Sequence, residues 1–259
     1  SIVQAYSGGM SITGPDSSTP TRAGIPIGDL GSGLFSIIGI LSALYSREKT
    51  NVGQHIDISL LDVQISLLTY MATMQTLSGI DPEPIGNAHF VHVPYNSFTT
   101  KDGFVVIAVI TDAFWESLKA VVNVDSLNDS KFNLSTDRLK NKTFIEAELN
   151  KALSKETSDF WIEKLNKVKV PCAPINKFSD ALADEQVIHR NMMVDVEHPD
   201  GGFVKMPGNP VKMSFTDENY YTPPPHLGAH TEEILKEWGN YDDNLIQDLI
   251  ENNIIQSVN

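Results

Sequence analysis

Asp29 is the residue whose type and position could most directly do chemistry. It follows Gly28 at the point where an extended segment passes into a long, apolar-periodic stretch. The start of a helix offers unpaired backbone N–H groups and the positive end of the helix dipole, which stabilise a carboxylate and fix its direction. Such an aspartate could act as a covalent nucleophile towards an acyl carbon. The plainer interpretation is a helix N-cap, and the local pattern alone favours that role.

The run Gly86-Asn87-Ala88-His89 is a second candidate, because it places an amide and an imidazole in a connection without periodicity. It could form a flexible lid, since loops on a scaffold often carry function. An ordinary Gly-Asn turn with a surface histidine fits the run equally well. The histidines lack metal-ligand spacing, so no metal site is predicted.

Composition narrows the possible partners. The 259 residues contain 19 Lys plus Arg and 33 Asp plus Glu, a net charge of −14. This charge repels phosphate backbones and argues against nucleic acid as a partner. No apolar run is expected to approach the ~20 residues of a membrane span, so no membrane association is predicted. Cys172 is the only cysteine, which fits a reducing compartment; we expect a cytoplasmic protein, or a mitochondrial one in a eukaryote.

The elements that must position these candidates begin with a helix. Large apolar side chains recur from Leu30 to Tyr45 at helical spacing, which predicts one broad buried stripe. Residues 54–60 alternate polar and apolar like a strand. A second helix starts near Leu61, and residues 78–94 form a connection.

A compact α+β unit follows. We expect a strand at 104–110 and helices capped by Thr111 and Thr157, with a capping box formed by Thr143 and Glu146. A hairpin is predicted at 193–206, with its turn at 199–202. Two helices, near 231–238 and 242–252, end the chain.

Several motifs in order resemble one family along essentially the whole chain. The chain is similar to the class III CoA-transferases, the family of formyl-CoA transferase and carnitine CoA-transferase, in residues 2–14, 28–44, 50–62, 86–89, 94–95, 170–174 and 227–235. The resemblance implies an α/β fold: an incomplete Rossmann-like large domain and a smaller α+β domain, joined by long linkers. We therefore expect residues 1–75 to be the remainder of the large domain, 76–94 a linker, 95–165 the small domain, and 166–259 a return segment with terminal helices packing on the large domain. The amino-terminal part is expected to be missing, and the full-length protein to be a homodimer.

The resemblance also implies roles for the candidate residues. Asp29 matches the aspartate that is the nucleophile in the family, so the resemblance favours the nucleophile over the helix N-cap. Gly28, Gly86, Asn87 and His89 would contact substrate. The substrates would be acyl-CoA and small carboxylic acids, with no permanently bound cofactor. CoA would move between acids through an aspartyl anhydride and an aspartyl-CoA thioester.

Two alternatives stay open. An α-methylacyl-CoA racemase or epimerase of the same superfamily would use Asp29 for proton transfer with a histidine. A non-catalytic acyl-CoA-binding module would use Asp29 only as a cap. Trapping with hydroxylamine separates the transferase from the binding module.

Overall fold

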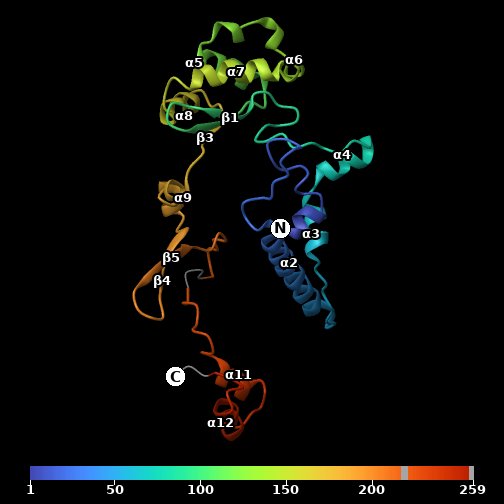
Figure 1. The fold of residues 1–259 in the computed structure, drawn as a ribbon, viewed down its shortest axis with the longest axis vertical. Coiled ribbons are helices and arrows are strands. Elements are labelled where there is room, and N and C mark those ends of the chain that lie inside the picture. Colours follow the sequence, from blue (N-terminus) through green and yellow to red (C-terminus); the bar gives the residue numbers. More distant parts are fainter. Residues whose placement is uncertain (217–220, 257–259) are drawn as a thin grey trace. The chain divides into compact units, whose positions relative to one another are not determined.

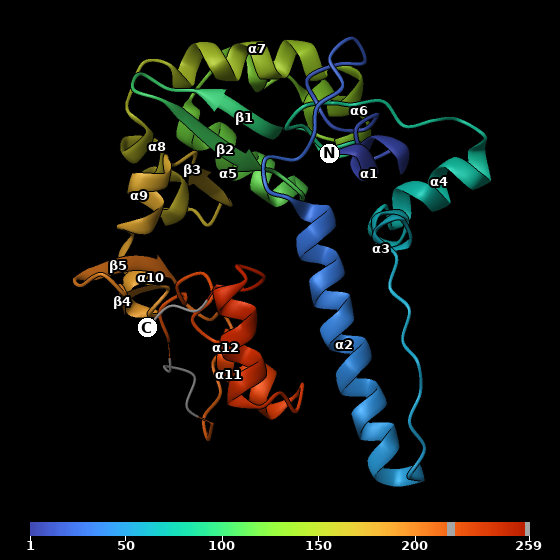
Figure 2. The ribbon, with the colours of Figure 1, turned by 60° about the horizontal axis from the view of Figure 1, so that its bottom comes forward.

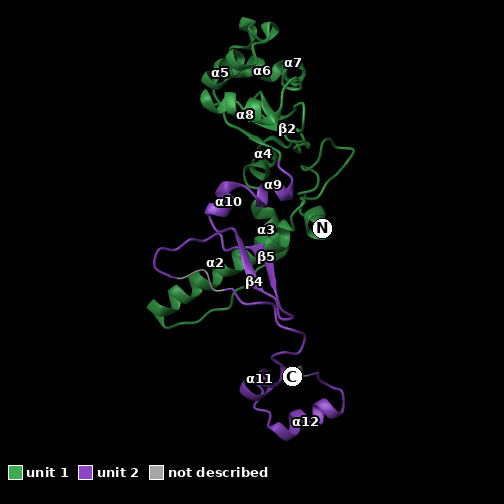
Figure 3. Cartoon of the chain, turned by 90° about the vertical axis from the view of Figure 1, so that its left-hand side faces the viewer, with its two compact units in different colours: residues 1–175 green, residues 176–259 purple. Residues whose placement is uncertain are grey.

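The computed structural model describes residues 1–216 and 221–256. The chain divides into two compact units, residues 1–175 and residues 176–259 (Figure 3). The division into four segments expected from the resemblance stays a prediction.

Unit 1 begins with a group of helices. It comprises α1 (Ile2–Tyr6), the long α2 (Ile27–Thr50), α3 (Leu60–Leu67) and α4 (Tyr70–Ser78) (Figure 1). The helix α3 packs against both α1 and α2. Asn51 ends α2 with a left-handed backbone, a conformation that asparagine tolerates.

Residues 51–59 run back along α2 to α3 without forming the expected strand (Figure 2). A strand needs a hydrogen-bonded neighbour, and among the described residues this segment has none. Its apolar residues instead pack against the helix, as Ile56 does beside Gly39. The strand prediction for 54–60 was therefore wrong.

The apolar stripe of α2 is exposed rather than buried, which corrects a second expectation. Only three of its residues, Gly28, Gly31 and Ser32, are buried, because α3 covers a single narrow face of the helix. By length and composition α2 could cross a membrane. The expectation that no apolar segment is long enough for a membrane span was therefore wrong. The core helix of a water-soluble domain passes the same test, so this finding assigns no location.

The rest of unit 1 is an α+β unit with its own core. The strands β1 (Tyr95–Thr99), β2 (Phe104–Ala108) and β3 (Cys172–Pro174) form an antiparallel sheet in that order. Helices α7 (Lys142–Leu153) and α8 (Ser158–Lys167) pack on the sheet, and α5 (Asp112–Val122) packs on both of them. The helix α6 (Ser135–Lys140) and the short 3₁₀ turns η1 (Asp125–Leu127) and η2 (Ser130–Phe132) complete the unit. The core includes Trp115, Phe98 and Leu149.

Local signals predicted most of this unit. Thr111 and Thr157 cap α5 and α8 through their side chains, as expected. The capping box at Thr143 was wrong, because α7 begins at Lys142 and Thr143 lies inside the helix. Asn141 is the N-cap of α7 but makes no side-chain cap bond; its side-chain Nδ2 donates to the carbonyl oxygen of Asp137 in the preceding helix.

Unit 2 contains short elements. The expected hairpin is formed by β4 (Met193–Glu197) and β5 (Phe203–Pro207), in register from Met193–Pro207 to Glu197–Phe203. The helices are α9 (Phe178–Leu182), α10 (Glu185–His189), α11 (Thr231–Glu237) and α12 (Asp243–Glu251).

Candidate active site

Asp29 lies in the first turn of α2, and its side chain is exposed. Pro26 is the N-cap, so the interpretation of Asp29 as the N-cap was wrong. Pro26 pre-sets the backbone near helical φ but has no side-chain acceptor to offer the first turn. Asp29 is therefore an accessible carboxylate at the positive end of a 24-residue helix.

The first turn of α2 keeps free backbone donors. The amide of Leu30 donates to the Pro26 oxygen at 3.0 Å. In the part of the chain that the structure describes, no side chain caps the turn, and the amides of Gly28 and Asp29 have no acceptor. Uncapped amides at a helix start attract negative charge.

Gly28 is buried and lies against the side chain of Gln64 on α3. A Cβ atom on Gly28 would be 3.8 Å from Gln64 Nε2. Ser59 caps the start of α3, where its hydroxyl accepts from the amides of Leu61 and Asp62 at 3.2 and 3.3 Å. Local reasoning did not find Gln64, because its position within an apolar-periodic helix carries no signal of a site.

The second candidate run is an ordered loop. The amide of Gly86, at a φ of 63°, donates to the Gly14 oxygen at 2.9 Å, and Asn87 Nδ2 donates to Ser97 Oγ at 3.0 Å. Gly14 belongs to the loop that leads towards α2. No hydrogen bond among the described residues joins Asp29 to residues 86–89 directly.

His89 is held by its backbone and by its ring. Its amide donates to the Tyr95 oxygen at 3.2 Å, and its Nδ1 accepts from the amides of Val91 and His92 at 3.1 and 3.2 Å. The ring stacks on Tyr95, with centroids 5.3 Å apart. Partial burial, and then the neighbouring His92, lower the pKa of His89 below its ordinary value. Both effects favour the neutral form of the imidazole.

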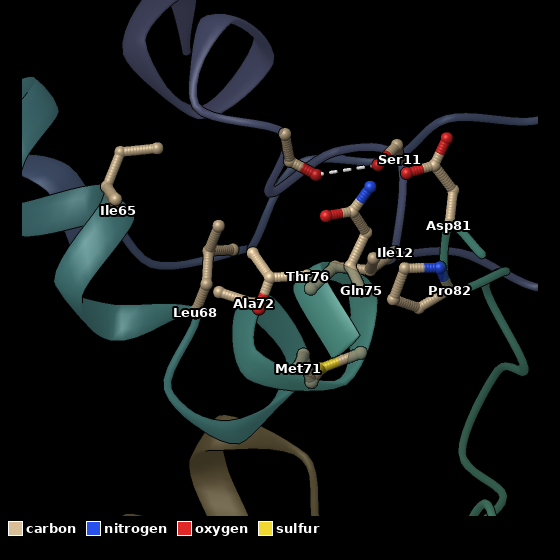
Figure 4. A pocket seen from close by; sticks show the side chains of 11 residues that line it. Ser11, Ile12, Ile65, Leu68, Met71, Ala72, Gln75, Thr76, Asp81 and Pro82 are labelled. Atoms are coloured by element: carbon tan, nitrogen blue, oxygen red, sulfur yellow. Dashed lines mark hydrogen bonds between the residues drawn. The ribbon is translucent and has the colours of Figure 1, made fainter. Parts of the chain in front are cut away.

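A pocket lies between residues 8–12 and the helices α3 and α4 (Figure 4). Ser11, Gln75 and Asp81 lie close together on one side of it, while Leu68 and Met71 contribute apolar surface. Asp29 is not among its lining residues. Among the described residues, no group of three or more His, Cys, Asp or Glu side chains could hold a metal ion.

Comparisons with known proteins identify the family. The family model for CoA-transferase family III matches residues 1–231. Human succinyl-CoA:glutarate CoA-transferase is 32% identical over 255 residues, 98% of this chain and 58% of that protein. Acetyl-CoA:oxalate CoA-transferase of Acetobacter aceti is 36% identical over 240 residues, 92% of this chain and 60% of that protein.

Solved structures agree with this family. The fold is similar to that of a CAIB/BAIF family protein from Brucella suis, with a TM-score of 0.79 and 31% identity, covering 91% of this chain and 61% of that one. The chain belongs to CoA-transferase family III, which confirms the resemblance seen in the sequence and the α/β class. It spans about three-fifths of the length of these relatives.

Proposed function

We propose that the protein is an acyl-CoA:carboxylate CoA-transferase, which moves CoA between small organic acids. Family membership supports the reaction class, and relatives that act on succinyl-CoA with glutarate and on acetyl-CoA with oxalate support small acids as substrates. We also propose that the reaction needs no permanently bound cofactor and that the full-length protein is a homodimer. The carrying observation is the exposed carboxylate of Asp29 in the uncapped first turn of α2.

Asp29 is the nucleophile in this proposal. Its carboxylate oxygen attacks the thioester carbonyl carbon; the new C–O bond forms and the C–S bond breaks, which releases CoA thiolate and leaves a mixed anhydride. The thiolate then attacks the aspartyl carbonyl carbon, frees the first carboxylate and leaves an aspartyl-CoA thioester. An acceptor carboxylate repeats the two steps in reverse.

Both intermediates would hydrolyse if water reached them, so the site must exclude water. Residues 86–89 are proposed to form part of the cover, with Gly28, Gly86, Asn87 and His89 in contact with substrate. The order of this loop, held by Gly14, Ser97 and Tyr95, supports a defined position for it.

The test is to trap the intermediate in the complete encoded protein. With acyl-CoA and hydroxylamine, peptide mass spectrometry should find a hydroxamate at Asp29. Asp29→Asn should abolish the adduct and lower transfer by about a thousandfold or more, because a covalent nucleophile is lost.

Asp159→Asn is the matched control, since Asp159 is an exposed aspartate in the first turn of α8. This variant should keep the wild-type rate. CoA binding without a hydroxamate at Asp29 would contradict the proposal and favour a binding module. Exchange of the α-proton of a 2-methylacyl-CoA with solvent, again without the adduct, would favour the racemase.

A further inference from the structure

Gln64 has a buried side-chain amide that lacks a hydrogen-bond acceptor. The residue is 5% exposed, and its Nε2 has no partner among the described residues. Buried side-chain amides in folded proteins are nearly always satisfied, so an unpartnered one needs an explanation. The amide lies against Gly28, one residue before Asp29.

The other buried polar side chains near the start of α2 all have partners. Gln4 Oε1 accepts from the amide of Ala23 at 2.9 Å, Ser7 Oγ donates to the Gln4 oxygen at 3.3 Å, and Ser32 Oγ donates to the Gly28 oxygen at 2.7 Å. These bonds hold the segment before α2, the end of α1 and the first turn of α2. Gln64 Nε2 is the donor that this internal network does not use.

Three donors without an acceptor therefore lie at or beside the start of α2. They are Gln64 Nε2 and the amides of Gly28 and Asp29, none of which has an acceptor in the described residues. Because residue 28 is glycine, no side chain stands between the Gln64 amide and the helix end. A set of fixed donors at a helix start is suited to an oxygen that carries negative charge.

We propose that Gln64 Nε2, with the first-turn amides of α2, binds the carbonyl oxygen of the acyl group while Asp29 attacks its carbon. This inference rests on the proposed function, because it assigns a donor to the same reaction. When the C–O bond forms, the carbonyl oxygen becomes negatively charged, and the donors stabilise that charge. The same donors serve when the acceptor acid completes the exchange.

The experiment replaces the donor without changing the size of the side chain. In the complete encoded protein, Gln64→Met should lower kcat by about a hundredfold, the loss seen when one oxyanion donor is removed. The KM for acyl-CoA should stay within about threefold, since the bond strengthens mainly in the transition state. Gln186→Met, at an exposed glutamine of α10, is the matched control and should keep the wild-type kcat.

A spectroscopic measurement separates the proposed role from a purely structural one. Succinyl-CoA labelled with ¹³C at the thioester carbonyl is bound to the Asp29→Asn variant, and its C=O stretch is recorded by isotope-edited infrared spectroscopy. We expect the band at lower wavenumber than in water, moving back towards the water value in the Asp29→Asn, Gln64→Met double variant. If Gln64→Met does not fold, Gln64→Leu serves in both measurements, because leucine has no hydrogen-bond donor and adds no charge beside Asp29.

The outcomes distinguish this inference from the proposed function. A hydroxamate at Asp29 in the wild type together with a kcat within threefold for the Gln64 variant overturns the role of Gln64 and leaves the transferase standing. Absence of the hydroxamate in the wild type overturns the proposed function itself. An infrared band that the Gln64 substitution does not move overturns the inference whether or not the transferase proposal holds.

Discussion

At the scale of a single residue, the surroundings of His89 favour one tautomer and the neutral form of its ring. Its Nδ1 accepts two backbone amides, so the neutral ring carries its proton on Nε2 and offers one donor. Burial and the nearby ring of His92, with centroids 4.6 Å apart, lower the pKa of His89. The pKa of His89 in the folded protein therefore lies below the unfolded value of about 6.5. The neutral ring of His89 contributes fully to the free energy of unfolding above pH 6.5, and this contribution is lost as the pH falls through the folded pKa.

Replacing His92 by alanine should raise the pKa of His89 towards its ordinary value. The substitution removes the nearby positive charge that forms on acidification and admits water to the His89 ring. Titration of the His89 ring by NMR measures the midpoint directly. His55→Ala, an exposed histidine outside this loop, is the control, and an unchanged His89 midpoint in His92→Ala would contradict the assigned causes.

At the scale of elements, Arg138 joins several segments of the α+β unit. The residue is 1% exposed, and its guanidinium donates to the carbonyl oxygens of Val93, Phe132 and Asn133 and to Asp112 Oδ1. It thus connects α6 with the chain before β1, with η2 and with the first turn of α5. Burial of the guanidinium charge is tolerated because its N–H groups donate to three carbonyl oxygens and one carboxylate.

Loss of Arg138 should destabilise the protein far more than loss of its ionic partner. We expect Arg138→Met to lower the free energy of unfolding by about 3 kcal/mol, because three carbonyl groups lose a charged donor. Asp112→Asn should cost about 1 kcal/mol or less, since that side chain is 59% exposed and its charge is screened. Urea unfolding of both variants measures the difference, and equal losses would show that the ion pair alone matters.

At the scale of the molecule, the buried apolar core is concentrated in one part of the chain. The main core cluster of the described residues lies between Val93 and Val170. In unit 2, Val196 and Ile246 are the buried large hydrophobic residues in the described part. The α2 helix also exposes large residues, such as Leu34 at 64%. Stability is therefore distributed unevenly along the sequence.

A polypeptide of residues 93–175 should fold by itself. It contains the main core cluster, the three-stranded sheet and the helices that pack on it, so we expect a single cooperative urea transition. The described residues of 176–259 bury few large apolar side chains, so a polypeptide of that range should show no such transition. Circular dichroism during urea titration checks both, and a gradual transition for 93–175 would be contrary to this expectation.

Local patterns predicted those features that depend on neighbouring residues. The caps at Thr111 and Thr157 and the hairpin at 193–207 each follow from a few consecutive side chains. The cap expected at Thr143 failed, because the N-cap of α7 is Asn141, two residues earlier, and the side-chain Nδ2 of Asn141 donates to Asp137 in the neighbouring helix. A local signal identifies a helix, but its first residue also depends on the segment before it.

The family and the place of Asp29 at a helix start could be inferred from ordered motifs and periodicity. The amide of Gln64 beside Gly28, the exposure of α2 and the missing strand partner of residues 54–60 could not. These features depend on which distant segments of the chain come into contact and which do not. Spacing within one segment specifies which side chains share a face, whereas the identity of the neighbour that covers that face emerges only when the chain has folded.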